Sequence, residues 1–377
     1  MEKYSMQSDP WIQEINVEAL PGDEDGDVVL DVTFTIASDA EVDAPELVFG
    51  AGHCPLLLDA IQSSAASIGR WKGPLIVFSL RDGSRWDGSI VRLEMRLGAA
   101  RLPIYVPDDL PTLVGSGPSP QRPLPTIRWI TDELVTGVRF LGLPAPAAPS
   151  ARVWGAVTAV PAQTLEIDGV NVGFSAMAAA LSHDRSAVAQ QIVTVFSALE
   201  REYGSPGVTE VMVISEAERR RENPWTGMLL PLTESGLFGA MPRDHGLFQA
   251  EVARIVASCW VGGLWRTYDI GPEWLFWGIH SGMRADFVKR TDPGLYSRLL
   301  PLMTKRLSPS PLKRFQRDVR YDMRAAAVGL HVLALLEVEF DRATFRRMLK
   351  EFSGTSVAAE DVMTFLALPP ELRGEVR

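Results

Sequence analysis

The hydrophobic periodicity of this chain changes once, near residue 176, and that change constrains the fold more than any other feature of the sequence. Ahead of it, apolar and polar residues alternate in runs such as residues 28–36 (VVLDVTFTI), 90–97 (IVRLEMRL) and 153–160 (VWGAVTAV), which is typical of half-buried β-strands. Beyond it, apolar residues recur every three or four positions, which predicts amphipathic helices. The sequence therefore predicts an α+β protein.

The two periodicities also predict two domains. We expect an N-terminal antiparallel β-domain in residues 1–165 and a mainly α-helical domain with a small strand layer in residues 166–377. A chain of 377 residues with 46% hydrophobic content is large enough to build a core in each. Within the second domain, a strand is expected at residues 208–214. Helices are expected at residues 188–199, 247–262, from 273 onward, and at 318–336, 344–351 and 358–366.

Composition and charge exclude several classes of partner and location. The formal net charge of −10 argues against a nucleic-acid partner, because phosphate backbones are bound through many Lys and Arg contacts. The N-terminus has neither a basic start nor an apolar run, and nowhere do about 18 uncharged apolar residues follow one another. The two cysteines, Cys54 and Cys259, are too few for a disulfide framework. We therefore expect a cytoplasmic protein that binds neither nucleic acid nor membrane.

Residues 254–263 (RIVASCWVGG) and 274–283 (WLFWGIHSGM) resemble a paired motif of the aminopeptidase N-like gluzincin metallopeptidases. In that family H-E-x-x-H-x-W-x-G is followed by W-L-x-E-G, with eighteen residues between the second histidine and the glutamate that follows. Here eighteen residues separate Ser258 from Trp277, and the tryptophans and glycines of both motifs are in place. The resemblance implies a thermolysin-like (gluzincin) fold for the second domain.

The residues that carry the chemistry of that family are replaced in this chain. In the family the two histidines and the later glutamate bind zinc, and a further glutamate activates water. Arg254 and Ser258 stand at the histidine positions, Trp277 at the glutamate ligand and Ile255 at the general base. An arginine does not release its proton to bind a cation, and an indole only donates. The resemblance therefore implies a non-catalytic relative that holds no zinc and no other cofactor.

Further segments resemble family elements in the expected order. Residues 203–206 (YGSP) resemble the turn F-G-x-Y-P, and residues 345–365 resemble the closing F-x-x-x-L-x-x-Y and T-x-x-D-F elements. Residues 321–325 (YDMRA) resemble Y-E-K-G-A, whose tyrosine stabilises the oxyanion, so Tyr321 would be the one catalytic position retained. The large C-terminal helical domain of the family has no counterpart, so the resemblance implies a truncated, two-domain member.

The family also has a G-x-M-E-N strand that runs along the substrate and binds its free amine. By spacing, residues 226–230 (TGMLL) are the expected equivalent, which places Gly227 and Met228 beside the ligand. A leucine then stands where the amine-binding glutamate belongs. The resemblance therefore gives no support for recognition of a free N-terminus.

A preserved spacing without its ligands favours a binding function. We expect an extended peptide, or a protein, to bind in the groove between the β-domain and the helices, partly by pairing along a strand edge. The candidate binding residues are Gly227, Met228, Arg254, Ser258, Trp277, His280 and Tyr321. The Arg-, Ala- and Pro-rich composition suggests a GC-rich bacterial genome. There, an inactive relative would suit a carrier of precursor peptides in ribosomal natural-product biosynthesis, with the modifying enzymes as partners.

Two other functions are compatible with the same residues. In the first, the surface docks another protein as a scaffold, and the cleft is a relic filled by Trp277 and its neighbours. In the second, Ser258, His280 and Tyr321 form a metal-independent hydrolase, which requires these side chains to converge within hydrogen-bond distance. A purely structural interpretation of Arg254 is an ion pair with Glu273 or Asp322.

Overall fold

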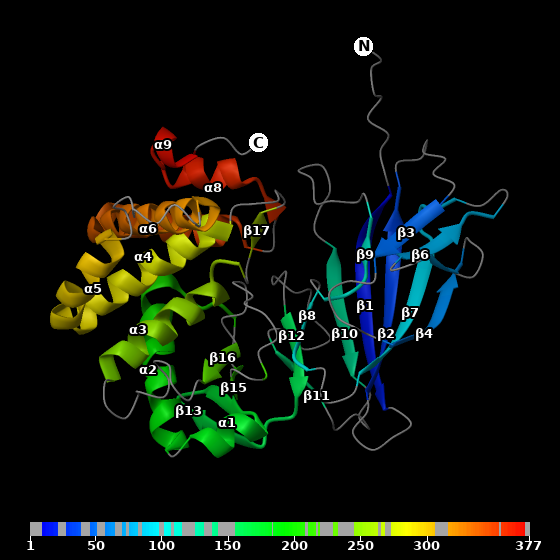
Figure 1. Cartoon of the computed structure of the whole chain (residues 1–377), viewed down its shortest axis with the longest axis horizontal. Helices are drawn as coiled ribbons and strands as arrows, with labels where there is room; N and C mark the ends of the chain where they lie inside the picture. The colour runs from blue at the N-terminus through cyan, green and yellow to red at the C-terminus, as the bar shows by residue number, and fades with distance from the viewer. Residues whose placement is uncertain are drawn as a thin grey trace, which may run out of the picture. The chain divides into compact units, whose positions relative to one another are not determined.

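The computed structural model describes two compact units, Met1–Val160 and Pro161–Arg377 (Figure 1). The described residues run from 10 to 373, without residues 22–27, 39–45, 51–56, 65–69, 73–74, 82–84, 98–101, 107–108, 115–124, 132–137, 142–154, 183, 208–209, 216–217, 219–228, 233–244, 263–264, 268–272, 306–315 and 354–355. The predicted α+β class is confirmed, since the first unit is built of sheets and the second is mainly helical.

The first unit contains a five-stranded sheet in the order β10-β1-β2-β7-β4. Its strands are β1 (Trp11–Pro21), β2 (Val28–Ala37), β4 (Leu57–Ser63), β7 (Ile90–Leu97) and β10 (Thr126–Thr131). All neighbours pair antiparallel except β1 and β10, which are parallel. The alternation in the sequence is explained by β2, whose Leu30, Val32 and Phe34 are fully buried on one face.

Two smaller antiparallel sheets complete the first unit as described. One has the order β5-β6-β3-β9, and the other has the order β11-β12-β8. Their strands are β3 (Glu46–Gly50), β5 (Arg70–Lys72), β6 (Leu75–Ser79), β8 (Ile104–Val106), β9 (Thr112–Leu113), β11 (Val138–Leu141) and β12 (Gly155–Ala159). Phe34, Phe49 and Phe78 join two of the sheets, with ring centroids 5.3 and 6.0 Å apart along the row. The aromatic row therefore links these sheets into one core.

The second unit begins with a four-stranded sheet in the order β13-β14-β15-β16. The strands are β13 (Gln163–Ile167), β14 (Val170–Phe174), β15 (Glu210–Ser215) and β16 (Leu229–Leu232). Asp168 and Gly169 both have positive φ (49° and 78°) and close the β13–β14 hairpin, as an Asp-Gly turn favours. The domain boundary expected between residues 165 and 166 therefore falls inside β13, a strand that this hairpin attaches to the second unit.

Helices make up most of the second unit. They are α1 (Ala176–Leu181), α2 (Arg185–Tyr203), α3 (His245–Val256), α4 (Glu273–Thr291), α5 (Pro293–Lys305), α6 (Gln316–Glu337), α7 (Glu339–Glu351), α8 (Ala359–Phe365) and α9 (Pro370–Arg373). A short parallel pair joins β17 (Arg266–Thr267) to β18 (Ser356–Val357). The largest fully buried side chains of this unit are Phe174, Phe196, Phe248, Trp260, Trp265, Phe276 and Phe287. None of the helices described is both long and apolar enough to cross a bilayer.

Helices α4 and α6 lie side by side in Figure 1 and approach closely because glycines face each other across the contact. A Cβ atom added at Gly278 would lie 2.5 Å from the Cβ of Val328, and one at Gly282 would lie 2.7 Å from Val332. Gly329 on α6 is equally constrained, with the Gly278 carbonyl oxygen 2.9 Å from its ideal Cβ position. Gly278 is the glycine that matches the end of the family pattern W-L-x-E-G. Its presence is thus explained by helix packing alone.

Candidate functional site

The two family-like motifs occupy adjacent helices of the second unit. Arg254 lies in the last turn of α3, and Ser258 lies in the 3₁₀ turn Ala257–Cys259 that continues it. Trp277 and His280 lie on α4. The spacing of four residues between Arg254 and Ser258 places both near one face of the same helical segment.

Arg254 and Trp277 contact each other directly. The guanidinium carbon of Arg254 lies 5.1 Å from the centroid of the Trp277 ring, a cation–π contact between α3 and α4. Two of the three positions that match zinc ligands in the sequence are therefore close in space, as the resemblance to the family implies.

Glu251 is the ion-pair partner of Arg254. The Nε of Arg254 donates to Oε1 of Glu251 at 2.7 Å, and Nη2 contacts the same oxygen. The other oxygen of Glu251 lies 3.5 Å from Nη1 of Arg284 on α4. The side chains of Glu273 and Asp322, the partners suggested by the sequence, lie outside the described part of the structure, so that interpretation stays a prediction. Residues three apart on a helix are neighbours, so Glu251 needs no distant element to reach Arg254.

Ser258 is buried, and its hydroxyl group donates to the backbone carbonyl oxygen of Ile255 at 2.8 Å. This is a local bond of the kind that serines form inside helices. The hydroxyl is therefore engaged by its own helical turn rather than by a base.

His280 is buried and neutral. Its Nε2 lies 2.8 Å from the carbonyl oxygen of Val261, and because a carbonyl only accepts, Nε2 carries the proton. The pKa of His280 is lowered to about 4. Burial is the largest cause; the hydrogen bond to Val261 acts in the opposite direction, and the charge of Arg254 lowers the pKa as well. Its ring packs edge-on to Trp277 with centroids 6.2 Å apart. At neutral pH this imidazole carries no charge.

The hydrolase interpretation is not supported by this geometry. Ser258 and His280 give their protons to two different backbone carbonyl oxygens, those of Ile255 and Val261. Tyr321 lies in α6, but its side chain is outside the described part of the structure. The predicted convergence of the three side chains therefore stays a prediction, and the bonds seen for Ser258 and His280 go to nearby backbone acceptors, as burial requires.

Two predicted binding residues lie outside the described residues. These are Gly227 and Met228, which immediately precede β16. Of the seven predicted site residues, the structure therefore brings together Arg254, Trp277 and His280, with Ser258 one turn from Arg254. Glu251 belongs beside them, although sequence reasoning missed it because an acid three residues before an arginine is common on helix surfaces.

Trp260 shows why two of the family-like segments occur together. Its Nε1 donates to the carbonyl oxygen of Gly204 at 2.7 Å, in the turn after α2. Gly204 has a φ of 85°, which favours glycine there. The tryptophan of the first motif thus holds the turn of residues 203–206. Both segments have a structural reason for being present.

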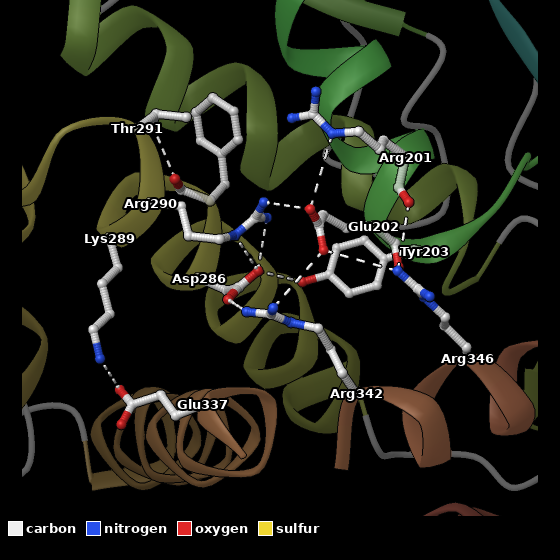
Figure 2. A network of polar contacts seen from close by, with 11 residues as sticks. Arg201, Glu202, Tyr203, Asp286, Lys289, Arg290, Thr291, Glu337, Arg342 and Arg346 are labelled. Atoms are coloured by element: carbon white, nitrogen blue, oxygen red, sulfur yellow. Dashed lines mark hydrogen bonds and ion pairs between the residues drawn. The ribbon is translucent and has the colours of Figure 1, made fainter. Parts of the chain in front are cut away.

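A second polar cluster, which sequence reasoning missed, lies where α2, α4 and α7 meet (Figure 2). At its centre, Asp286 accepts hydrogen bonds from the hydroxyl group of Tyr203 (2.9 Å), from Nη2 of Arg290 (2.8 Å) and from Nη2 of Arg342 (2.8 Å). Its side chain is only 3% exposed. Burial first, and then the charge of Asp286, raise the pKa of Tyr203 well above its usual value. The cluster therefore connects α2, α4 and α7 through buried hydrogen bonds and ion pairs.

Glu202 extends this cluster toward the surface. Its carboxylate pairs with Nη1 of Arg290 at 2.9 Å, and Nε of Arg346 donates to its backbone carbonyl oxygen. Because Arg346 lies on α7, this bond also closes the C-terminal end of α2. Each arginine has a protein partner, so the arrangement is explained by helix docking.

The fold is that of the M1 zinc metallopeptidases and leukotriene A4 hydrolase. Leukotriene A4 hydrolase from Saccharomyces cerevisiae superposes with a TM-score of 0.62 over 98% of this chain and 67% of that chain, at 12% identity. A two-domain M1 zinc metallopeptidase, in a variant bound to L-tryptophan, gives 0.56 over 96% and 92%, at 14% identity. The M1 zinc metallopeptidase from Deinococcus radiodurans gives 0.54 over 98% and 94%, at 14% identity.

These likenesses establish the fold, and the resemblance inferred from the motifs is confirmed at that level. This chain spans almost the whole length of the two-domain metallopeptidase. No protein-family model matches the sequence, and no curated protein sequence matches it.

The residues at the motif positions do not fit the zinc ion named for these neighbours. Zinc needs lone pairs from imidazole, thiolate or carboxylate groups. Arg254 and Trp277 have only donors, and the hydroxyl of Ser258 is bonded to Ile255. Within the described ranges, no group of three or more His, Cys, Asp or Glu residues is arranged to hold a metal ion. No chemical step through zinc follows from these side chains.

Proposed function

We propose that this chain is a non-catalytic protein of the M1 peptidase fold that binds a peptide at the face of α3 and α4 carrying Arg254 and Trp277. The observation that carries the proposal is the contact of 5.1 Å between the Arg254 guanidinium and the Trp277 ring. It places a cation and an aromatic surface at positions that match metal ligands in the family. Replacing metal ligands by these two side chains favours binding of a peptide without cleavage.

The chemical groups near this face support a non-catalytic function. Ile255 stands at the position of the general base and has no titratable group. His280 is neutral, and its Nε2–H is used by Val261. Among the described residues, the hydroxyl group of Ser258 donates to the carbonyl oxygen of Ile255, which is not a base. Hydrolysis needs an activated nucleophile, and these residues do not supply one.

The same residues are suited to binding. Arg254 is 22% exposed in its side chain, and Trp277 is half-buried, so both reach the surface of the second unit. Arginine and tryptophan are the side chains most often found where protein surfaces bind a partner tightly. Their cation–π contact holds them in one arrangement before the ligand arrives, which lowers the entropy cost of binding.

The finer form of the proposal is a carrier of precursor peptides that presents them to modifying enzymes in a bacterial biosynthetic pathway. A carrier must hold a peptide without cutting it, which agrees with the side chains at Arg254, Ser258 and Trp277. The test is co-purification. A carrier expressed with the neighbouring genes of its own genome retains a short peptide, whereas a scaffold retains a folded protein and no peptide.

The first experiment measures hydrolysis, zinc and binding on the same preparation. We expect no cleavage of aminoacyl-coumarin substrates with or without added Zn²⁺, no stoichiometric zinc by plasma mass spectrometry, and micromolar binding of peptides by calorimetry. Arg254→Met should weaken binding. Arg298→Met, an exposed arginine on α5, is the matched control and should not. Cleavage dependent on zinc, or no binding of any peptide, would refute the proposal.

A further inference from the structure

We infer that the ligand presents a carboxylate to Arg254, either an acidic side chain or a free C-terminal group. The inference rests on the proposed peptide-binding function and adds the chemical class of the group that is recognised. Three observations support it: the contacts that Arg254 makes with Glu251, the N–H groups that these contacts use, and the aromatic rings of Trp277 and His280 beside it.

Among the described residues, the hydrogen bonds of Arg254 use one edge of its guanidinium group. A guanidinium has five N–H groups in a flat fork, and those used here are on Nε and Nη2, both directed at Oε1 of Glu251. In the part of the chain that the structure describes, no bond is recorded for Nη1 of Arg254. This side of the fork has the geometry that binds the two oxygens of a carboxylate.

Glu251 does not remove the attraction for a second anion. Its carboxylate lies between two guanidinium groups, with Oε1 on Arg254 and Oε2 at 3.5 Å from Arg284. Its side chain is 14% exposed and is held between α3 and α4. It therefore orients Arg254, which is 22% exposed, through Nε and Nη2, and we infer that Nη1 is the group that meets the ligand.

Trp277 and His280 define the rest of the surface. The indole ring lies against the guanidinium at 5.1 Å, and the imidazole packs edge-on to the indole at 6.2 Å. His280 is neutral, so it does not compete with Arg254 for an anion, and its buried ring supports Trp277 from below the surface. A carboxylate next to an apolar group therefore fits this surface better than an amine.

The test uses N-acetylated pentapeptide pools of mixed sequence, one with a free and one with an amidated C-terminus. The full-length protein captures peptides, and mass spectrometry identifies those retained. We expect about ten-fold enrichment of carboxylate-bearing peptides, the size of one charge-assisted hydrogen-bonded pair. Enrichment of Asp and Glu in the amidated pool identifies a side chain as the source. Enrichment only in the free pool, without preference for Asp or Glu, identifies the C-terminus.

Variants of Arg254 test whether its charge is needed for the enrichment, independently of whether the protein folds. Arg254→Met should lose the enrichment, Arg254→Lys should keep part of it because the charge remains, and Arg298→Met should match the wild type. Circular dichroism tests whether each variant is folded. If Arg254→Met does not fold, the comparison of Arg254→Lys with the wild type decides whether the carboxylate inference holds. Equal recovery of peptides with and without a carboxylate would overturn the carboxylate inference and leave peptide binding intact. Recovery of no peptide would overturn both.

Discussion

At the scale of single residues, burial decides what the polar groups near the motifs do. Ser258 and His280 are both almost fully buried, and each donates to a backbone carbonyl oxygen. A buried donor left unpaired costs about 1–3 kcal/mol, so these bonds are required for stability. Arg254 differs because it keeps partial exposure and pairs with Glu251. Of these groups, the arginine is the one available to a ligand.

His280 makes the stability of the protein depend on pH. Its pKa falls from 6.5 in the unfolded chain to about 4 in the fold, chiefly through burial. Between about pH 6.5 and pH 4, His280 is protonated in the unfolded chain but not in the folded protein. The stability present above about pH 6.5 is therefore lost as the pH falls toward 4. Between about pH 7 and about pH 5, we expect His280 to lower the free energy of unfolding by about 2 kcal/mol.

His280→Gln tests this expectation. Glutamine keeps an N–H donor for the Val261 carbonyl oxygen but does not titrate. Urea unfolding of both proteins at the two pH values gives the free energies. The variant should lose about 2 kcal/mol less than the wild type over this interval. An identical pH dependence in the two proteins would show that His280 is not a buried neutral group.

At the scale of elements, α4 is the helix on which the second unit is assembled. It contacts α6 through glycines, α3 through Trp277 and Arg254, and α2 and α7 through Asp286. A change on α4 therefore acts on several contacts at once.

We expect Gly278→Ala to destabilise the protein by about 1–3 kcal/mol, because the added Cβ would lie 2.5 Å from Val328 and would force α4 and α6 apart. The control is Gly294→Ala on α5, where the nearest atom, Oδ1 of Asp292, is 3.4 Å away. That change should be neutral or slightly stabilising, since alanine favours helices. Thermal unfolding followed by circular dichroism measures both. Similar melting temperatures for the two variants would contradict the close packing.

Asp286→Asn tests the buried cluster in Figure 2. Removing this charge leaves Arg290 and Arg342 without their shared buried partner, so we expect a loss of about 3–5 kcal/mol. Glu337→Gln is the matched control, because it also removes an acid that pairs with α4, but the side chains of Lys289 and Glu337 are 42% and 43% exposed. An exposed pair contributes at most about 1 kcal/mol. Chemical denaturation should separate the two variants clearly, and equal losses would mean that the cluster is solvated.

At the scale of the whole molecule, each unit has the sheets or helices needed for a core of its own. The second unit, Pro161–Arg377, contains a four-stranded sheet and the helices that carry both motifs. Such units usually fold alone. We expect residues 161–377, expressed separately, to give a helical circular dichroism spectrum and a cooperative thermal transition. A chain that remains unfolded would show that this unit depends on the first.

Much of the second unit was predictable from local signals. The expected helices at 318–336 and 344–351 correspond to α6 and α7, and the strand at 208–214 corresponds to β15. Helix α5 was missed, although Asp292 and Pro293 form a helix start, with Asp292 accepting a bond from the Leu295 amide. The β13–β14 hairpin was not predicted either, although Asp168-Gly169 is a typical hairpin turn. In both cases the sequence signal is only two residues long.

The sequence by itself determined the fold class and the order and spacing of the two family-like motifs. Both depend on periods and spacings along the chain, which persist in the fold. Only the tertiary structure decided that Glu251 is the partner of Arg254, that His280 is neutral, and that Asp286 joins three helices. Tyr203 and Asp286 are 83 residues apart. Burial and such distant pairings depend on how helices pack against one another, and one-dimensional patterns do not contain that information.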